Sequence, residues 1–129
     1  MLSRRRAHLT TLAELLSDAD PMIMRGGTGS KALAAIRAKL ADANPADPLL
    51  LMTTVPYGGE GFDAPIIDTV FLVGPISYPG LLKQAVGRAL RRHEGKTEVI
   101  VHDYVDANVP VLNAQYSRRR VAYRQMGFS

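Results

Sequence analysis

Residues 68–104 read DTVFLVGPISYPGLLKQAVGRALRRHEGKTEVIVHDY, with an amphipathic segment between two apolar ones. The segments 68–74 and 98–104 are short, apolar and bounded by turn residues, which is typical of buried strands. Residues 79–92 predict a helix, because six apolar residues recur there at helical spacing: Leu81, Leu82, Ala85, Val86, Ala89 and Leu90. A strand, a helix and a second strand in this order predict a parallel βαβ unit.

The rest of the chain extends this alternation. We expect helices over residues 5–17, 30–40 and 108–126, with Ser30 capping the second, and a fully buried strand over 49–54. The fold class is therefore α/β, a three-layer sandwich with a mostly parallel sheet. Only Met1-Leu2-Ser3 precede the first helix, so we expect the first strand to be truncated and the chain to begin partway through it.

The composition of the chain excludes several classes of protein and of functional site. The chain has 129 residues, 47% of them apolar and 22% charged, which fits one globular domain. The net charge is +4, and Arg outnumbers Lys twelve to four; the planar guanidinium suits phosphate and carboxylate groups. The absence of Cys excludes a disulfide framework, a thiolate zinc site and a Cys nucleophile. No signal peptide or membrane span is recognisable, so we expect a cytoplasmic protein without a membrane partner.

The loop RGGTGSKA, residues 25–32, resembles two nucleotide-binding motifs and satisfies neither. A phosphate loop ends in Gly-Lys-Ser/Thr, but Ser30 separates Gly29 from the lysine. The looser dinucleotide fingerprint needs an acidic residue after the next strand, where Thr53 and Thr54 stand instead. We interpret the loop as a strand-to-helix turn whose amides could still meet a phosphate.

The segment 84–91 carries the clearest chemical signal. Arg88 and Arg91 are three residues apart, Gln84 lies one turn before Arg88, and all three share one helix face. Gly87 removes a side chain beside them, although glycine inside a helix costs about 1 kcal/mol relative to alanine. Two guanidiniums and an amide suit a cluster of phosphate oxygens. The alternative from the residues alone is a solvated basic face.

Three stretches together resemble a known family. QAVGRALRR, residues 84–92, is similar to motif VI (QxxGRxxR) of superfamily-two DEAD/DEAH-type helicases. GEGFDAP, residues 59–65, resembles motif V, and LSRRRAHL, residues 2–9, is similar to the motif IV region. Their order and spacing resemble a C-terminal RecA-like lobe of the P-loop NTPase type, and bacterial type III restriction-subunit (Res) helicases in particular. Residues 1–129 would then be one helicase C-terminal domain.

The resemblance implies roles for individual residues around ATP. Arg88 and Arg91 take the positions of arginine fingers that reach the γ-phosphate of ATP bound by the other lobe. Gln84 takes that of the residue touching the γ-phosphate or the attacking water. Gly61 and Asp63 match motif V positions that approach the nucleotide, and Gly87 is grouped with these nucleotide-contacting positions. No metal ligand is expected in this chain, so Mg²⁺ would be held by the other lobe.

The resemblance also implies nucleic acid as a partner. Thr54, the loop residues Gly26 and Gly27, and Arg5 fall where the family meets the nucleic-acid backbone, without sequence preference. We expect DNA rather than RNA. The second expected partner is an N-terminal lobe with a Walker A lysine and an acidic Walker B box, in cis or in trans, because these 129 residues contain neither. Alone, the chain is expected to hydrolyse nothing.

Other polar clusters carry weaker signals. His8, His93 and His102 are scattered in the sequence, which argues against a metal site. Asp103 and Asp106 follow a predicted strand and could act as an acid/base pair, or lie in a solvated loop. The run Arg118–Arg120, with tyrosines at 116 and 123, could follow a nucleic-acid backbone or form a charged outer helix face.

Three functions remain open from the sequence. The first is the second motor lobe of an ATP-dependent nucleic-acid helicase or translocase, a hydrolase when complete. The alternative is a non-catalytic remnant domain that binds nucleic acid or a protein. A dinucleotide-binding enzyme is the third and most distant possibility, because the acidic residue is missing after 49–54.

Overall fold

The computed structural model describes the chain in eight stretches: residues 1–3, 5–24, 28–44, 46–54, 65–74, 76, 79–92 and 95–128, with Arg88 represented by its backbone. The strands are β1 (Leu2–Ser3), β2 (Met22–Met24), β3 (Leu51–Thr54), β4 (Thr69–Leu72) and β5 (Ile100–Asp103). The helices are α1 (Arg6–Leu15), the short 3₁₀ turn η1 (Ser17–Ala19), α2 (Ser30–Asp42), α4 (Pro79–Ala89) and α5 (Pro110–Gln125).

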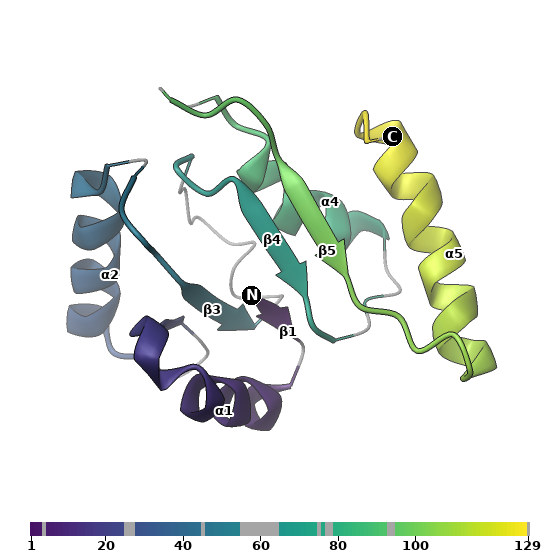
Figure 1. The fold of residues 1–129 in the computed structure, drawn as a ribbon, viewed down its shortest axis with the longest axis horizontal. Helices are drawn as coiled ribbons and strands as arrows, with labels where there is room; N and C mark the ends of the chain where they lie inside the picture. The colour runs from purple at the N-terminus through teal and green to yellow at the C-terminus, as the bar shows by residue number, and fades with distance from the viewer. Residues whose placement is uncertain are drawn as a thin grey trace.

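The five strands form one sheet in the order β2-β3-β1-β4-β5, and every described pairing is parallel (Figure 1). β1 lies at the centre although it has two residues. Leu2 pairs with Thr53 on one side and with Leu72 on the other, and Ser3 pairs with Thr54. Because the strands are parallel, their carboxyl ends share one edge of the sheet and their amino ends share the opposite edge.

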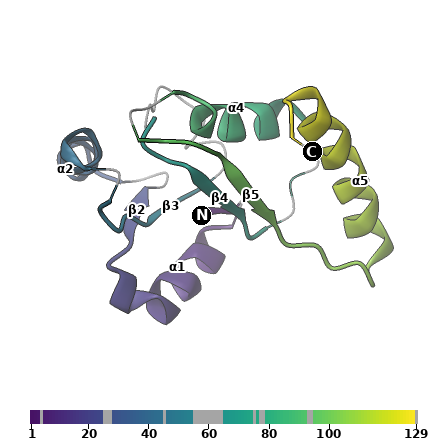
Figure 2. The same cartoon turned by 45° about the horizontal axis from the view of Figure 1, so that its top comes forward.

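Helices cover both faces of this sheet. Right-handed crossovers place α1 on one face and α2 and α4 on the other, because the connection through α1 runs across the sheet in the opposite direction. Figure 2 shows α1 on one side of the strands and α4 with α5 on the other. The predicted three-layer α/β sandwich is therefore confirmed, with every described strand parallel. No helix in the described stretches is both long enough and apolar enough to cross a membrane.

The main core lies between the sheet and α4. Leu82, Val86 and Ala89 of α4 are almost completely buried, and Leu72 of β4 packs in the same cluster. This apolar stripe fixes the rotation of α4 about its axis, so the remaining positions of the helix face outward. The predicted inward stripe is thus confirmed except at its end, where Leu90 is 40% exposed because the helix has already ended at Ala89.

The element boundaries agree with the sequence within a few residues, with one correction to the chemistry of a helix start. Ser30 was expected to cap α2 from outside, but it is the first helical residue, and Gly29 occupies the cap position without a side-chain hydrogen bond. The physical reason is that Gly29 adopts the extended backbone of a cap (φ −63°, ψ 153°) one residue earlier.

Candidate nucleotide and nucleic-acid interface

The outward side of α4 carries the residues predicted to meet ATP. Gln84 is exposed, Gly87 is half-buried, and Arg91 is exposed just beyond the end of the helix. The backbone of Arg88 lies in the last turn of α4, and its side chain is outside the described part. The helix therefore brings Gln84, Gly87 and the Arg88 backbone to one side, leading to Arg91.

Gly87 lies beside open space. A Cβ built at this position would meet no atom of the chain within 4 Å. Packing within the described chain therefore does not require glycine here, even though glycine weakens a helix. A small residue at this point leaves room for a surface that approaches α4 from outside.

Lys96 closes the C-terminal end of α4. Its ammonium donates hydrogen bonds to the carbonyl oxygens of Ala89, Arg91 (2.7 Å) and Pro65 (3.0 Å). Burial lowers the pKa of Lys96, and the charge of Asp68 opposes that shift. A cation here neutralises the negative end of the helix dipole and pairs carbonyls that have no partner within the helix. Sequence reasoning missed this contact, although a Gly-Lys pair directly after a helix was its signal.

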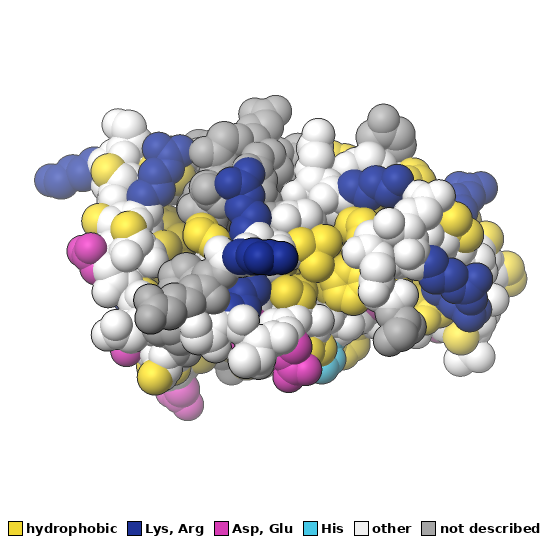
Figure 3. All heavy atoms as spheres, turned by 90° about the horizontal axis from the view of Figure 1, so that it is seen from above, with side chains coloured by type: hydrophobic (Ala, Val, Ile, Leu, Met, Phe, Trp, Pro, Cys, Tyr) yellow, Lys and Arg dark blue, Asp and Glu magenta, His cyan; other side chains and the backbone are white. Residues whose placement is uncertain are grey.

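The edge at which β4 and β5 begin carries side chains of both charges. Arg91, Arg92, Lys96 and Glu98 lie beside a cavity of about 330 Å³ that Met126 and Phe128 also line from the end of α5. Figure 3, which views the molecule from above Figure 1, shows several Lys and Arg side chains next to apolar surface at this edge. The guanidiniums of Arg91 and Arg92 suit a phosphate group brought by a second domain.

The predicted nucleic-acid residues lie at the opposite edge, where the strands end. Thr54 ends β3 in register with Ser3, and Arg5 follows at the start of α1 with its side chain exposed. The Ser3 hydroxyl accepts a hydrogen bond from the Arg5 amide (3.2 Å) and shares another with His8 Nδ1 (3.1 Å). Thr54 itself is only 8% exposed, so Arg5 is the more accessible side chain of this edge.

A cavity of about 740 Å³ lies at the same edge, beside Ser3, Arg5 and His8 on one side and Gly74 on the other. A Cβ at Gly74 would lie 2.9 Å from Ser3 Oγ, so a larger residue there would force the Ser3 side chain to shift. Arg91, beyond the end of α4, thus lies beside the edge where β5 begins, whereas Arg5 and Thr54 lie at the edge where the strands end.

Four predicted site residues fall outside the described residues: Gly26, Gly27, Gly61 and Asp63. The predictions for them therefore stand as made. Within the described stretches, no group of three or more His, Cys, Asp or Glu side chains could hold a metal ion.

Two minor sequence interpretations need correction. Arg119, in the run 118–120, is 3% exposed, so it neither follows a nucleic-acid backbone nor faces outward. It binds Asp103, whose side chain is also buried rather than in a solvated loop. The signal that sequence reasoning missed is the combination of an acidic residue at a strand end with an Arg and a Tyr four residues apart on the next helix.

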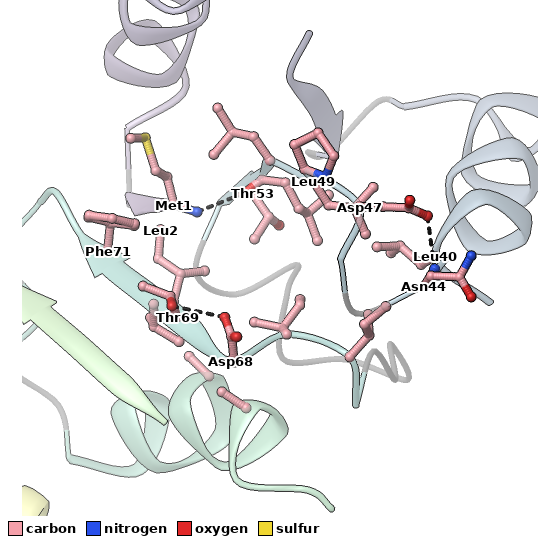
Figure 4. A pocket seen from close by; sticks show the side chains of 18 residues that line it. Met1, Leu2, Leu40, Asn44, Asp47, Leu49, Thr53, Asp68, Thr69 and Phe71 are labelled. Atoms are coloured by element: carbon pink, nitrogen blue, oxygen red, sulfur yellow. Dashed lines mark hydrogen bonds between the residues drawn. The ribbon is translucent and has the colours of Figure 1, made fainter. Parts of the chain in front are cut away.

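A cavity of about 450 Å³ opens between β3 and β4, beyond the start of β1 (Figure 4). Its wall is mainly apolar, and its acidic side chains already have partners: Asp47 accepts from the Asn44 amide (2.8 Å) and Asp68 from the Thr69 hydroxyl (2.9 Å). None of the predicted site residues lines it. It therefore lacks the polar groups that would recognise a nucleotide.

The crystal structure of the C-terminal part of the Fun30 ATPase domain matches with a TM-score of 0.74 and 18% identity, over 91% of this chain and 37% of that chain. The chain is a RecA-like α/β domain. No family model and no curated protein matches the sequence.

The likeness at 18% identity shows the fold alone, which this chain shares with the C-terminal part of that ATPase domain. This chain spans about 37% of the length of the solved chain that it matches. The match bears out the RecA-like fold that the resemblance at motifs IV, V and VI implies. It gives no support to the narrower resemblance to restriction-subunit helicases, which rests on the sequence alone.

Proposed function

We propose that this chain is the second motor lobe of an ATP-dependent nucleic-acid helicase or translocase. One observation supports this most strongly. In a RecA-like fold, α4 buries its apolar stripe and directs the motif VI positions Gln84 and Gly87 outward, leading to the exposed Arg91. A lobe with this surface suits phosphate presented from outside.

Within the proposal, Arg88 and Arg91 stabilise the negative charge that spreads over phosphoryl oxygens in the transition state. Gln84 holds the attacking water or a phosphate oxygen in place. ATP, bound by the N-terminal lobe together with Mg²⁺, supplies the phosphoryl group. Gly61 and Asp63, which match motif V in the sequence before β4, couple that event to nucleic acid.

Nucleic acid, with DNA preferred, would meet the opposite edge. Arg5 and Thr54, with the loop residues Gly26 and Gly27, contact backbone phosphates, which carry no sequence information. Closure of the two lobes around ATP then shifts these contacts along one strand. The separation of the two residue groups by the sheet suits such a motor, because one rigid lobe transmits movement from one edge to the other.

The test uses a two-lobe assembly: this chain joined to or mixed with an N-terminal lobe that carries the Walker A lysine and the acidic box. Nucleic-acid-stimulated ATPase should fall at least 100-fold in Arg88→Ala and in Arg91→Ala, since an arginine finger contributes about 10³–10⁵ in kcat. Lys83→Ala, which changes an exposed residue of α4 that binds Gln125 of α5, should stay within twofold. An unchanged ATPase rate in both Arg88→Ala and Arg91→Ala would show that these residues are not arginine fingers.

A second function is supported by a different observation: these 129 residues hold neither a Walker A lysine nor an acidic box. A lobe of this kind could bind nucleic acid or a protein without turnover. Steep salt dependence of nucleic-acid binding by the 129-residue chain, with no effect of ATP in the presence of an N-terminal lobe, would favour this alternative.

A further inference from the structure

The ammonium of Lys96 is hydrogen-bonded within the chain, unlike that of a fully solvated surface lysine. It lies after α4 and before β5, where Gly95 turns the chain with φ 81°. Its ammonium has three N–H donors, and three carbonyl oxygens accept from it: those of Pro65, Ala89 and Arg91. All donors of this group are therefore used within the chain, which leaves none for a phosphate.

The three carbonyls come from two separate parts of the candidate ATP site. Ala89 and Arg91 belong to the motif VI stretch, at the end of α4 and just beyond it. Pro65 is the last residue of the motif V stretch, 24 positions before Ala89 in the sequence. One ammonium thus holds the end of motif VI against the end of motif V.

The electrostatic setting makes this contact a strong tie. Carbonyls at a helix C-terminus carry partial negative charge, and a charged donor strengthens each hydrogen bond that it makes to them. Lys96 is only partly accessible to solvent, so water competes less for these carbonyls than at an open helix end. Loss of the ammonium would leave the Arg91 and Pro65 carbonyls without this shared donor.

The tie acts on the Arg91 main chain. α4 ends at Ala89, and the Lys96 ammonium binds the carbonyl of Arg91, two residues further on, at 2.7 Å. A guanidinium that must meet a phosphoryl group depends on where its backbone starts. A displacement of about 1 Å is enough to lower a rate about 100-fold.

We infer that Lys96 is a positioning residue of the ATP site: it fixes the backbone of Arg91 and joins motif VI to motif V without touching the nucleotide. This inference rests on the proposed motor function. It adds a residue outside both motifs to the machinery, and it assigns a structural link between the two motifs to a single side chain.

The experiment compares Lys96→Met, Lys96→Arg and Lys83→Met. Lys83 is the matched control, an exposed lysine of α4 whose ammonium donates to Gln125 Oε1 of α5 (2.8 Å). Amide hydrogen exchange of the 129-residue chain measures the tie directly. Lys96→Met should speed exchange at residues 89–92 at least tenfold while the core of α4 stays protected, and Lys83→Met should not.

ATPase of the two-lobe assembly gives the functional readout. Lys96→Met should lower kcat at least tenfold with the KM for ATP within twofold, because finger contacts form mainly in the transition state. Lys96→Arg keeps a charged multiple donor and should recover kcat to within threefold of the parent. Arg91→Ala serves as the reference for a lost finger, and circular dichroism of each variant verifies folding.

The outcomes separate the two ideas. If Arg91→Ala is impaired while Lys96→Met keeps the parental kcat, the positioning role is wrong and the motor function stands. If neither Arg88→Ala nor Arg91→Ala changes the ATPase rate, the proposed motor function is wrong, and so is the role inferred for Lys96 in catalysis. Unchanged exchange at residues 89–92 in Lys96→Met overturns the tie itself, whatever the ATPase shows.

Discussion

Arg119 binds Asp103 through two hydrogen bonds, from Nε to Oδ2 at 2.7 Å and from Nη2 to Oδ1 at 2.9 Å. Its remaining nitrogen, Nη1, donates to the carbonyl of Ile76 (2.9 Å), and the Tyr123 hydroxyl donates to Asp103 Oδ2 (2.6 Å). This network joins α5 to the end of β5 and to the segment that leads into α4. It therefore holds the last helix against the element that carries motif VI.

Removal of Arg119 should destabilise the fold strongly. Arg119→Met leaves the Asp103 carboxylate buried without its ion-pair partner, which costs about 3–5 kcal/mol in the free energy of unfolding. Urea denaturation of the 129-residue chain measures this. Arg118→Met and Arg120→Met, which change exposed neighbours, should stay within about 0.5 kcal/mol.

The double variant Arg119→Met/Asp103→Leu tests the reason for that loss. It removes both charges, so it should be more stable than Arg119→Met alone. The explanation would be wrong if Arg119→Met lost less than about 1 kcal/mol in the free energy of unfolding. It would also be wrong if Arg119→Met/Asp103→Leu were less stable than Arg119→Met, because the loss would then not come from an unpaired Asp103 carboxylate.

The contact between Gly74 and Ser3 predicts a second, smaller effect. Gly74→Ala would bring Cβ to 2.9 Å from Ser3 Oγ at the centre of the sheet, so it should lower stability by about 1–3 kcal/mol. Ser3→Ala removes the hydroxyl, so the double variant should regain part of the loss. Thermal unfolding of the four chains measures the coupling, and strictly additive effects would show that the two sites do not meet.

Gly87 predicts opposite effects on stability and on activity. A Cβ at this position meets nothing within 4 Å, so Gly87→Ala should stabilise the isolated chain by about 0.5–1 kcal/mol through helix propensity. In the two-lobe assembly the same methyl group should lower ATPase, because it occupies the surface that the other lobe approaches. An activity equal to that of the parent would show that this surface stays free.

The amino group of Met1 predicts a pH dependence of stability in the 129-residue chain. It donates to the Leu51 carbonyl (2.6 Å), and burial lowers its pKa to about 6 from about 8. Below pH 6 the group is protonated in both states, and burying the charge opposes folding. Above pH 8 it is neutral in both, so its contribution to stability rises by about 2–3 kcal/mol between these values.

N-terminal acetylation is the control for that prediction, because it removes the titrating group. The difference in unfolding free energy between free and acetylated chains should change between pH 5.5 and 8.5, with the free chain gaining stability as pH rises. A difference that stays constant over this range would contradict the burial of a titrating amine beside β3.

Much of the fold could be predicted because local pattern and tertiary packing agree. The apolar residues of α4 recur at helical spacing, and those of β3 form one continuous run. Both elements occupy the layer that these patterns predict. Local pattern alone does not decide the roles of Arg119 and Lys96, since both depend on partners far away in the sequence: Asp103 for the first and Pro65 for the second. A run of arginines contains no information about which member turns inward.

The candidate site, too, could be predicted only in part. Helical spacing alone placed Gln84, Gly87 and Arg88 on one side of a helix that leads to Arg91, and the structure supports that arrangement. Spacing could not indicate that Thr54 would be largely covered while Arg5 stays open, because that depends on how β1, β3 and α1 meet at the edge.

If the outward side of α4 completes an ATP site on another lobe, nucleic-acid-stimulated ATPase of the two-lobe assembly must depend on its arginines. We expect at least a 100-fold loss of kcat in Arg91→Ala, with Lys83→Ala within twofold of the parent. Equal rates for Arg91→Ala, Arg88→Ala and the parent assembly would contradict it.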